Sequence, residues 1–241
     1  MPDYVEREFQ LLVSGLDCIV RGQDGNWEQY LFDNTDRINE ALPEYWAGLT
    51  LMLGDKEKVK TKDLLKLRSP DLNQIAIEIF RAGSLTDSII LRGRCPECKK
   101  PANYEKDLFD LDFMPIPDDK TGPDPTFEFV TPQWKTEVVW GYLTGEQELE
   151  QRKTKGFNPT RQTWKAIRSI NGSTDFTLKE VLAWPIADQE AIRGEIEDKQ
   201  CGYDPRIWLE HDCGNEVVMN LLTDPSFMMP GIRSAARRLR T

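Results

Sequence analysis

Four residues of this chain have types and spacings that bind a metal ion, and they lie in two stretches far apart in the sequence. Cys95 and Cys98 enclose a proline and a glutamate, so a tight turn directs two thiols to one point. His211, the single histidine of the chain, lies two residues before Cys213. Structural zinc is usually held by four cysteine or histidine ligands in a tetrahedron. The sequence therefore predicts a zinc site formed by Cys95, Cys98, His211 and Cys213.

The fourth ligand is the one least determined by spacing. A second turn of C-x2-C spacing would place its first ligand at Glu210, so His211 lies one residue out of that register. Cys201 and Glu210 are the alternative ligands. A site that has lost its metal, with reduced thiols in a turn and His211 on the surface, is the other interpretation. If zinc binds, three thiolates and one imidazole leave no position for a catalytic water, which indicates a structural ion.

The residues on either side of each turn are typical of β-strands. The runs are Ser88–Arg94 and Tyr104–Phe109 around the first turn, and Arg206–Glu210 and Glu216–Leu222 around the second. A strand, a turn that carries ligands and a second strand make up half of a zinc ribbon. We therefore expect a ribbon split into two half-sites, at residues 88–109 and 205–222.

The rest of the chain predicts an α+β protein that is mainly helical around this small split zinc ribbon. We expect an N-terminal helical region over residues 1–60, a core over 61–230 that includes a helical insertion at 126–200, and a basic tail over 231–241. Ser69 and Pro70 are typical of a helix start. Thr177 and Glu180 have the spacing of a capping box. Apart from the two half-sites, no internal repeat is visible in the sequence.

Composition limits the classes of function. The chain has 241 residues and a net charge of −10, although its last eleven residues contain four arginines and no acid. The remaining body is strongly acidic and should repel nucleic acid, whereas the tail could dock on an acidic surface. No apolar run is long enough for a membrane span, and the N-terminus does not resemble a signal peptide. An odd number of cysteines, five, argues against a disulfide framework.

Catalytic motifs are weak. With its one histidine assigned to metal, the chain cannot form a Ser-His-Asp or Cys-His base, and neither phosphate-binding glycine motif is present. We therefore expect a protein without enzymatic activity. Two other interpretations stay open. One is a zinc-ribbon protein that binds nucleic acid or acts in transcription, and the other is a metal-dependent hydrolase with an open metal position.

The order of several features resembles a known family. These features are a helix over Asp71–Ser84, the Cys95–Cys98 turn, Tyr142–Gly145 before a charged helix, Asp188–Glu190 at a helix start, and Asp224–Pro230 after the second turn. Together they resemble the zinc-ribbon-containing baseplate hub assembly proteins, or tail assembly chaperones, of contractile-tailed bacteriophages, over roughly residues 60–230. The chain departs from that family at Glu210–Cys213, where the family tends to have a second C-x2-C.

The resemblance implies a protein that assists or joins virion assembly through protein–protein interaction in the tail baseplate. Its partners would be phage baseplate and tail proteins. Its location would be the host cytoplasm during assembly, or the baseplate of the virion. The expected contact residues are the aromatic and methionine side chains near the end of the chain and the arginines of the tail: Trp208, Phe227, Met228, Met229, Arg237, Arg238 and Arg240.

Overall fold

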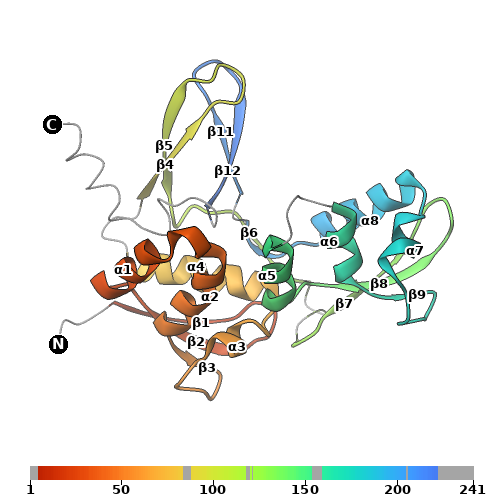
Figure 1. Cartoon of the computed structure of the whole chain (residues 1–241), viewed down its shortest axis with the longest axis horizontal. Helices are drawn as coiled ribbons and strands as arrows, with labels where there is room; N and C mark the ends of the chain where they lie inside the picture. The colour runs from red at the N-terminus through yellow and green to blue at the C-terminus, as the bar shows by residue number, and fades with distance from the viewer. Residues whose placement is uncertain are drawn as a thin grey trace.

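The body of the molecule contains two α/β units that lie side by side, shown at the left and right of Figure 1. The computed structural model describes residues 5–83, 88–117, 120, 122–153, 159–204 and 206–221. The first unit, residues 5–83, consists of β1 (Glu6–Gln10), β2 (Asp17–Arg21), α1 (Gly25–Asp33), the 3-10 turn η1 (Thr35–Arg37), α2 (Ile38–Leu49), β3 (Thr50–Leu53), α3 (Thr61–Leu64) and α4 (Ser69–Gly83). Its three strands form an antiparallel sheet in the order β1-β2-β3.

The second unit, residues 126–198, has the same order of elements. It consists of β7 (Thr126–Val130), β8 (Glu137–Gly141), α5 (Gly145–Lys153), α6 (Pro159–Ala166), β9 (Ile167–Ile170), α7 (Leu178–Leu182) and α8 (Ile186–Asp198). Its strands form an antiparallel sheet in the order β7-β8-β9. In both units a hairpin leads into two helices, a third strand beside the second, and two more helices.

Two further hairpins form an arm that projects from the body above the first unit (Figure 1). One follows the first unit and consists of β4 (Ser88–Arg94) and β5 (Pro101–Asp107); the other follows the second unit and consists of β11 (Arg206–Glu210) and β12 (Glu216–Asn220). At the base of the arm, the short strands β6 (Phe113–Met114) and β10 (Gly202–Tyr203) pair with each other. Each unit therefore supplies one hairpin of the arm.

Backbone hydrogen bonds show that the two units are repeats. In the first hairpin of each unit Glu6 faces Arg21 and Thr126 faces Gly141, with the same register throughout. The third strand joins with an irregularity at the same place in both sheets. The repeat extends from each sheet into the helices that follow.

The turn after the third strand is also repeated. Gly54, with φ of 54°, and Asn171, with φ of 48°, are both in the left-handed conformation that glycine and asparagine tolerate best. Each donates its N–H to the first residue of the second strand, Gly54 to the Asp17 carbonyl and Asn171 to the Glu137 carbonyl, both at 2.7 Å. The equivalent positions therefore make the same contact with different side chains.

These observations correct two expectations. The expectation of a mainly helical protein is wrong: among the described residues, eight helices account for 40% and strands for 27%, in several small antiparallel sheets of an α+β fold. Residues 126–200 hold a three-stranded sheet as well as helices. The chain also has an internal repeat, which the sequence does not reveal because backbone bonds define it and equivalent side chains mostly differ, as Cys18 and Val138 do.

Each unit has its own hydrophobic core. In the second core Phe127 stacks on the fully buried Trp140, with ring centroids 4.4 Å apart. The first core contains Leu31, Leu49 and Ile75 of the first unit together with residues at the base of the arm, namely Ile89, Leu91, Leu108, Ile207 and Leu221. The hairpin that follows the second unit is thus anchored in the core of the first.

Helix α4 connects the first unit to the base of the arm. Its Arg81 pairs with Glu78 at 2.7 Å and donates to the Tyr203 hydroxyl at 2.6 Å and to the Leu108 carbonyl at 3.1 Å. Glu78 also accepts from Arg7 at 2.5 Å. Because the Arg81 and Glu78 side chains are buried, these bonds satisfy charges that would otherwise be costly to desolvate.

The two units meet at a junction in which the stretch before α5 lies along the stretch before α4. The Ser69 N–H donates to the Leu143 carbonyl at 2.9 Å, and the Gly145 and Glu146 N–H groups donate to the Leu67 and Leu65 carbonyls, both at 3.0 Å. Arg68, between Leu67 and Ser69, pairs with Asp124 at 2.6 Å. The junction therefore combines main-chain pairing with one ion pair.

Gly145 at this junction and its repeat equivalent Gly25 should respond in opposite ways to alanine. A Cβ on Gly145 would lie 2.4 Å from Leu72 Cδ1 and 3.2 Å from Leu65 Cα, so we expect Gly145→Ala to lower the free energy of unfolding by about 1–3 kcal/mol. No atom lies within 4 Å of a Cβ on Gly25, so Gly25→Ala should raise it by about 0.4–1 kcal/mol. Urea unfolding measures both, and equal effects would contradict the close approach at Gly145.

Candidate metal centre

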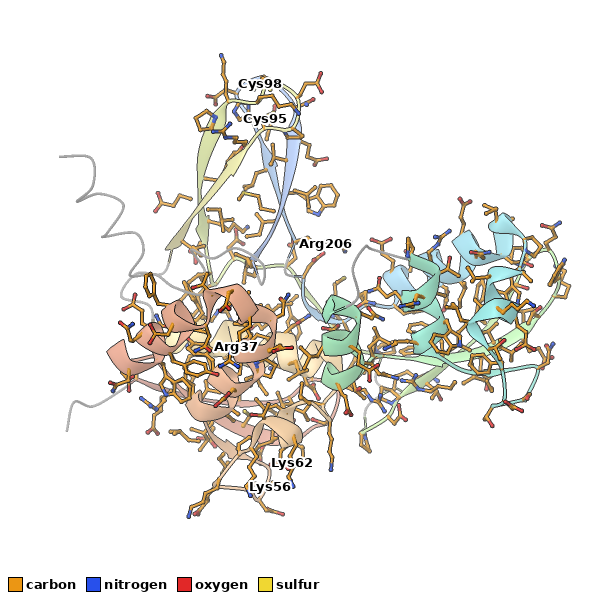
Figure 2. All side chains as sticks on the ribbon, in the orientation of Figure 1. Arg37, Lys56, Lys62, Cys95, Cys98 and Arg206 are labelled. Carbon is orange, nitrogen blue, oxygen red and sulfur yellow. The ribbon has the colours of Figure 1, made fainter. Side chains whose placement is uncertain are left out.

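The arm brings the four predicted ligands together at its tip, where Figure 2 shows Cys95 and Cys98 at the end farthest from the body. The ligand atoms of Cys95, Cys98, His211 and Cys213 all lie within 4.8 Å of one another. The Cys95 and Cys213 sulfurs are 3.6 Å apart, and His211 Nδ1 lies 3.7 Å from the Cys98 sulfur and 3.1 Å from that of Cys213. This cluster can hold a metal ion.

The spacing between the ligand atoms fits a small tetrahedral ion. Zinc bound at about 2.3 Å from sulfur and about 2.0–2.1 Å from nitrogen would separate two sulfurs by about 3.8 Å, and a sulfur from a nitrogen by about 3.5 Å. The contacts of 3.6, 3.7 and 3.1 Å lie close to those separations. The residues therefore fit zinc in both chemistry and size.

The backbone of the two turns explains how His211 becomes a ligand although it is out of register. In the first turn the Cys95 N–H donates to the Lys100 carbonyl at 3.1 Å; in the second the His211 N–H donates to the Asn215 carbonyl at 2.8 Å. The second turn is one residue shorter, so His211 occupies the position that Cys95 has in the first. The one-residue difference between H-x-C and C-x2-C therefore comes from the shorter turn. His211 is not displaced from the ligand position.

Hydrogen bonding and burial act differently on two of the thiols. The backbone N–H groups of Cys98 and Glu97 favour the thiolate of Cys95 and lower its pKa below the usual value, against an opposing effect of burial. The Asn215 N–H favours the thiolate of Cys213, but burial and the neighbouring Cys95 and Cys98 sulfurs outweigh it and raise the pKa of Cys213. A cation that neutralises the group would remove this mutual repulsion, since metal ligands bind as thiolates.

Tyr104 is a neighbour of the site that the sequence did not single out. It lies on β5, and burial together with the negative charges of Cys95, Asp212, Cys213 and Cys98 raises its pKa. Its hydroxyl is buried without a hydrogen-bond partner among the described residues. Polar groups around metal ligands often orient them by hydrogen bonding, although the Tyr104 hydroxyl makes no such bond to any residue that the structure describes. A tyrosine on the strand after a C-x2-C turn is too common for sequence to identify it as such a neighbour.

The other predicted residues lie elsewhere. Glu210 is exposed at the end of β11, and Cys201 is buried in the second core, so neither alternative ligand belongs to the cluster. Trp208 is exposed on β11 of the arm. The remaining expected contact residues, Phe227, Met228, Met229, Arg237, Arg238 and Arg240, lie outside the described residues.

Two general observations complete the description of the site. Within the part of the chain that the structure describes, no helix has the length and apolar character needed to cross a membrane. Comparisons of the chain with models of protein families, with curated proteins and with solved structures give no match.

Proposed function

We propose that this chain is a non-enzymatic assembly protein whose two repeats are fastened by a structural zinc ion, and that it acts in the tail baseplate of a contractile-tailed phage. The observation that carries the first part is the cluster of three thiols and one imidazole at the arm tip. Four such ligands complete the coordination of zinc and leave no position for substrate or water. The ion would hold residues in place and perform no reaction.

The position of the cluster supports a fastening role. Cys95 and Cys98 come from the hairpin that follows the first unit, and His211 and Cys213 come from the hairpin that follows the second. At the base of the arm both hairpins are fixed by the first core. At the tip, metal coordination would supply the corresponding link. An ion there sets the shape of the arm while the cores of the two units form independently of it.

The surface of the arm supports protein–protein interaction. Trp208 and Val218 face each other on β11 and β12, and their side chains are 54% and 46% exposed. A tryptophan and a valine paired across two strands form a compact apolar surface, and tryptophan is among the residues that most often dominate binding energy at interfaces. A rigid arm with an exposed tryptophan is suited to reach a partner protein.

The phage setting rests on the resemblance of residues 60–230 to the baseplate hub assembly proteins. Tail components assemble from several different proteins, so a chain that binds partners through a projecting arm suits such a role. The partners would be baseplate or tail proteins. Association would take place in the host cytoplasm, where the chain acts as a chaperone or enters the baseplate.

Co-expression with the tail proteins encoded beside this chain in its genome tests the proposal. We expect the wild-type chain to copurify with one of them, and Trp208→Ser with Val218→Ser to reduce recovery by at least about tenfold, because burying two such side chains contributes several kcal/mol. Phe32→Ser, at an exposed phenylalanine on α1, is the matched control and should leave recovery unchanged. A gene that lies outside any phage tail cluster, or equal losses in both variants, would contradict the proposal.

A further inference from the structure

The second unit exposes an apolar surface at the place where the first unit is covered. Leu182 and Ile186 occupy the repeat positions of Leu65 and Ser69, which lie at the junction, and Trp134 occupies that of Ser14. Leu182, Ile186 and Trp134 are 50%, 66% and 56% exposed. Their counterparts Leu65, Ser69 and Ser14 are half-buried. We call Trp134, Leu182 and Ile186 the distal patch.

The distal patch is held in place by the fold. The Asp188 carboxylate accepts the N–H of Gln133 at 2.7 Å and that of Trp134 at 3.0 Å. This fixes the turn that carries Trp134 beside the first turn of α8, where Ile186 is the first residue. Leu182 ends α7, four residues before Ile186. Three large apolar side chains are thus presented together on a fixed backbone, as they would be at an interface.

A glycine in the first unit indicates what covers the distal patch. At the junction, Gly145 begins α5 and approaches Leu65 and Leu72 so closely that a Cβ there would force its neighbours to shift. Its equivalent Gly25 begins α1 and is exposed, and no atom lies within 4 Å of a Cβ built there. Glycine is an unfavourable helix residue, and nothing within the described chain requires it at Gly25. A second molecule that approaches Gly25 as closely as Leu65 approaches Gly145 would require it.

We propose that this protein assembles head to tail with further copies of itself, the distal patch of one copy packing on the N-terminal end of α1, at Gly25, of the next. The contact would repeat the junction between the two units of a single chain. Such an interface joins two different surfaces and therefore leaves one of each free on a dimer, so it can extend to a ring or a filament. This inference rests on the repeat and is independent of the proposed role in a baseplate.

Hydrogen bonding at the two surfaces differs from that at the junction and determines the character of the contact. At the junction the Leu65 and Leu67 carbonyls accept from the Glu146 and Gly145 N–H groups. In the second unit Gln189 donates to the equivalent carbonyls, to that of Trp184 at 2.9 Å and to that of Leu182 at 3.4 Å. A carbonyl oxygen has two lone pairs, so these groups can still accept a second bond. On the other surface, however, the Asn26 N–H, which corresponds to that of Glu146, already donates to Asp24 at 3.0 Å. The apolar side chains of the distal patch would nevertheless contribute most of the affinity.

Sedimentation velocity over a concentration series, with the full chain loaded with zinc, tests the proposal. We expect the wild type to self-associate, and Ile186→Asp and Gly25→Glu each to raise the dissociation constant at least about tenfold. A glutamate in the first turn of α1 is favourable for the isolated chain, so Gly25→Glu should fold normally. Phe32→Asp, at an exposed phenylalanine near the other end of α1, is the matched control and should associate like the wild type.

A mixture of the two variants tests whether the contact joins two different surfaces or one surface with itself. The Ile186→Asp chain keeps an intact α1 end, and the Gly25→Glu chain keeps an intact distal patch, so an equimolar mixture should form one-to-one dimers and nothing larger. A Gly25→Glu chain that still dimerises by itself would mean that the distal patch pairs with itself, which overturns the head-to-tail arrangement. A mixture that stays monomeric while the wild type associates would mean that the distal patch does not bind the α1 end, which overturns it as well. A wild-type chain that stays monomeric at the highest concentration measured overturns the proposal as a whole.

Discussion

Replacing Cys98 with serine is expected to abolish stoichiometric metal binding and to release the tip of the arm. Structural zinc in small domains contributes about 10–16 kcal/mol of binding energy, which includes the energy of folding the site. Here the site joins two hairpins that are otherwise fixed at their base in the first core. We therefore expect elemental analysis to find about one zinc per wild-type chain and almost none in Cys98→Ser. Hydrogen exchange should increase over residues 88–107 and 206–220, while both units stay protected.

Two other cysteines provide the matched controls for this result. Cys18 is buried in the first core and Cys201 in the second, and both lie outside the cluster. Burial raises the pKa of Cys18 to about 12 and that of Cys201 to about 11, so neither is a ready thiolate ligand. Cys18→Ala and Cys201→Ala should keep the full metal content. A wild-type chain with less than about half a zinc, or unchanged exchange in Cys98→Ser, would contradict the fastening role.

Replacing Asp71 with alanine is expected to destabilise the first unit by about 2–5 kcal/mol. Asp71 lies in the first turn of α4, is fully buried, and accepts the N–H groups of Val13 at 2.7 Å and Ser14 at 3.0 Å. Alanine would leave two N–H groups without acceptors, and each buried unsatisfied group costs about 1–3 kcal/mol. Unfolding in urea measures the loss of stability, and hydrogen exchange of β1 and β2 shows whether the first unit is the part that loosens.

The repeat supplies the control for this experiment. Asp188 makes the same two bonds to the turn between β7 and β8, so Asp188→Ala should release the second unit and leave exchange of β1 and β2 as in the wild type. Asp71→Asn should destabilise the unit less than Asp71→Ala, because asparagine keeps one acceptor. Burial also makes the negative charge of Asp71 costly and raises its pKa, and asparagine carries no charge. If Asp71→Ala and Asp188→Ala increased hydrogen exchange in the same strands, the result would contradict the view that each aspartate stabilises its own unit.

The sequence by itself determined the local features of this protein. Two cysteines at C-x2-C spacing aim at one point whatever the rest of the fold, and a single histidine beside another cysteine leaves few other ligands. Ser69 and Pro70 predicted the start of α4, and Thr177 and Glu180 form the capping box that their spacing predicts. These features depend on residues a few positions apart, so neighbouring side chains are sufficient to specify them.

Only the tertiary structure revealed the repeat, the junction and the roles of the two aspartates. Asp71 and Asp188 look like ordinary acidic residues at helix starts, yet each binds a turn more than fifty residues away. Gly25 and Gly145 are both glycines at the first position of a helix. Only the folded structure shows that Gly25 is exposed, whereas Gly145 lies close to Leu65 and Leu72. The metal cluster likewise needed both hairpins to be anchored in one core. Contacts of this kind depend on backbone groups and on surfaces that meet after folding, and backbone groups are the same at almost every residue, so they leave little trace in the sequence.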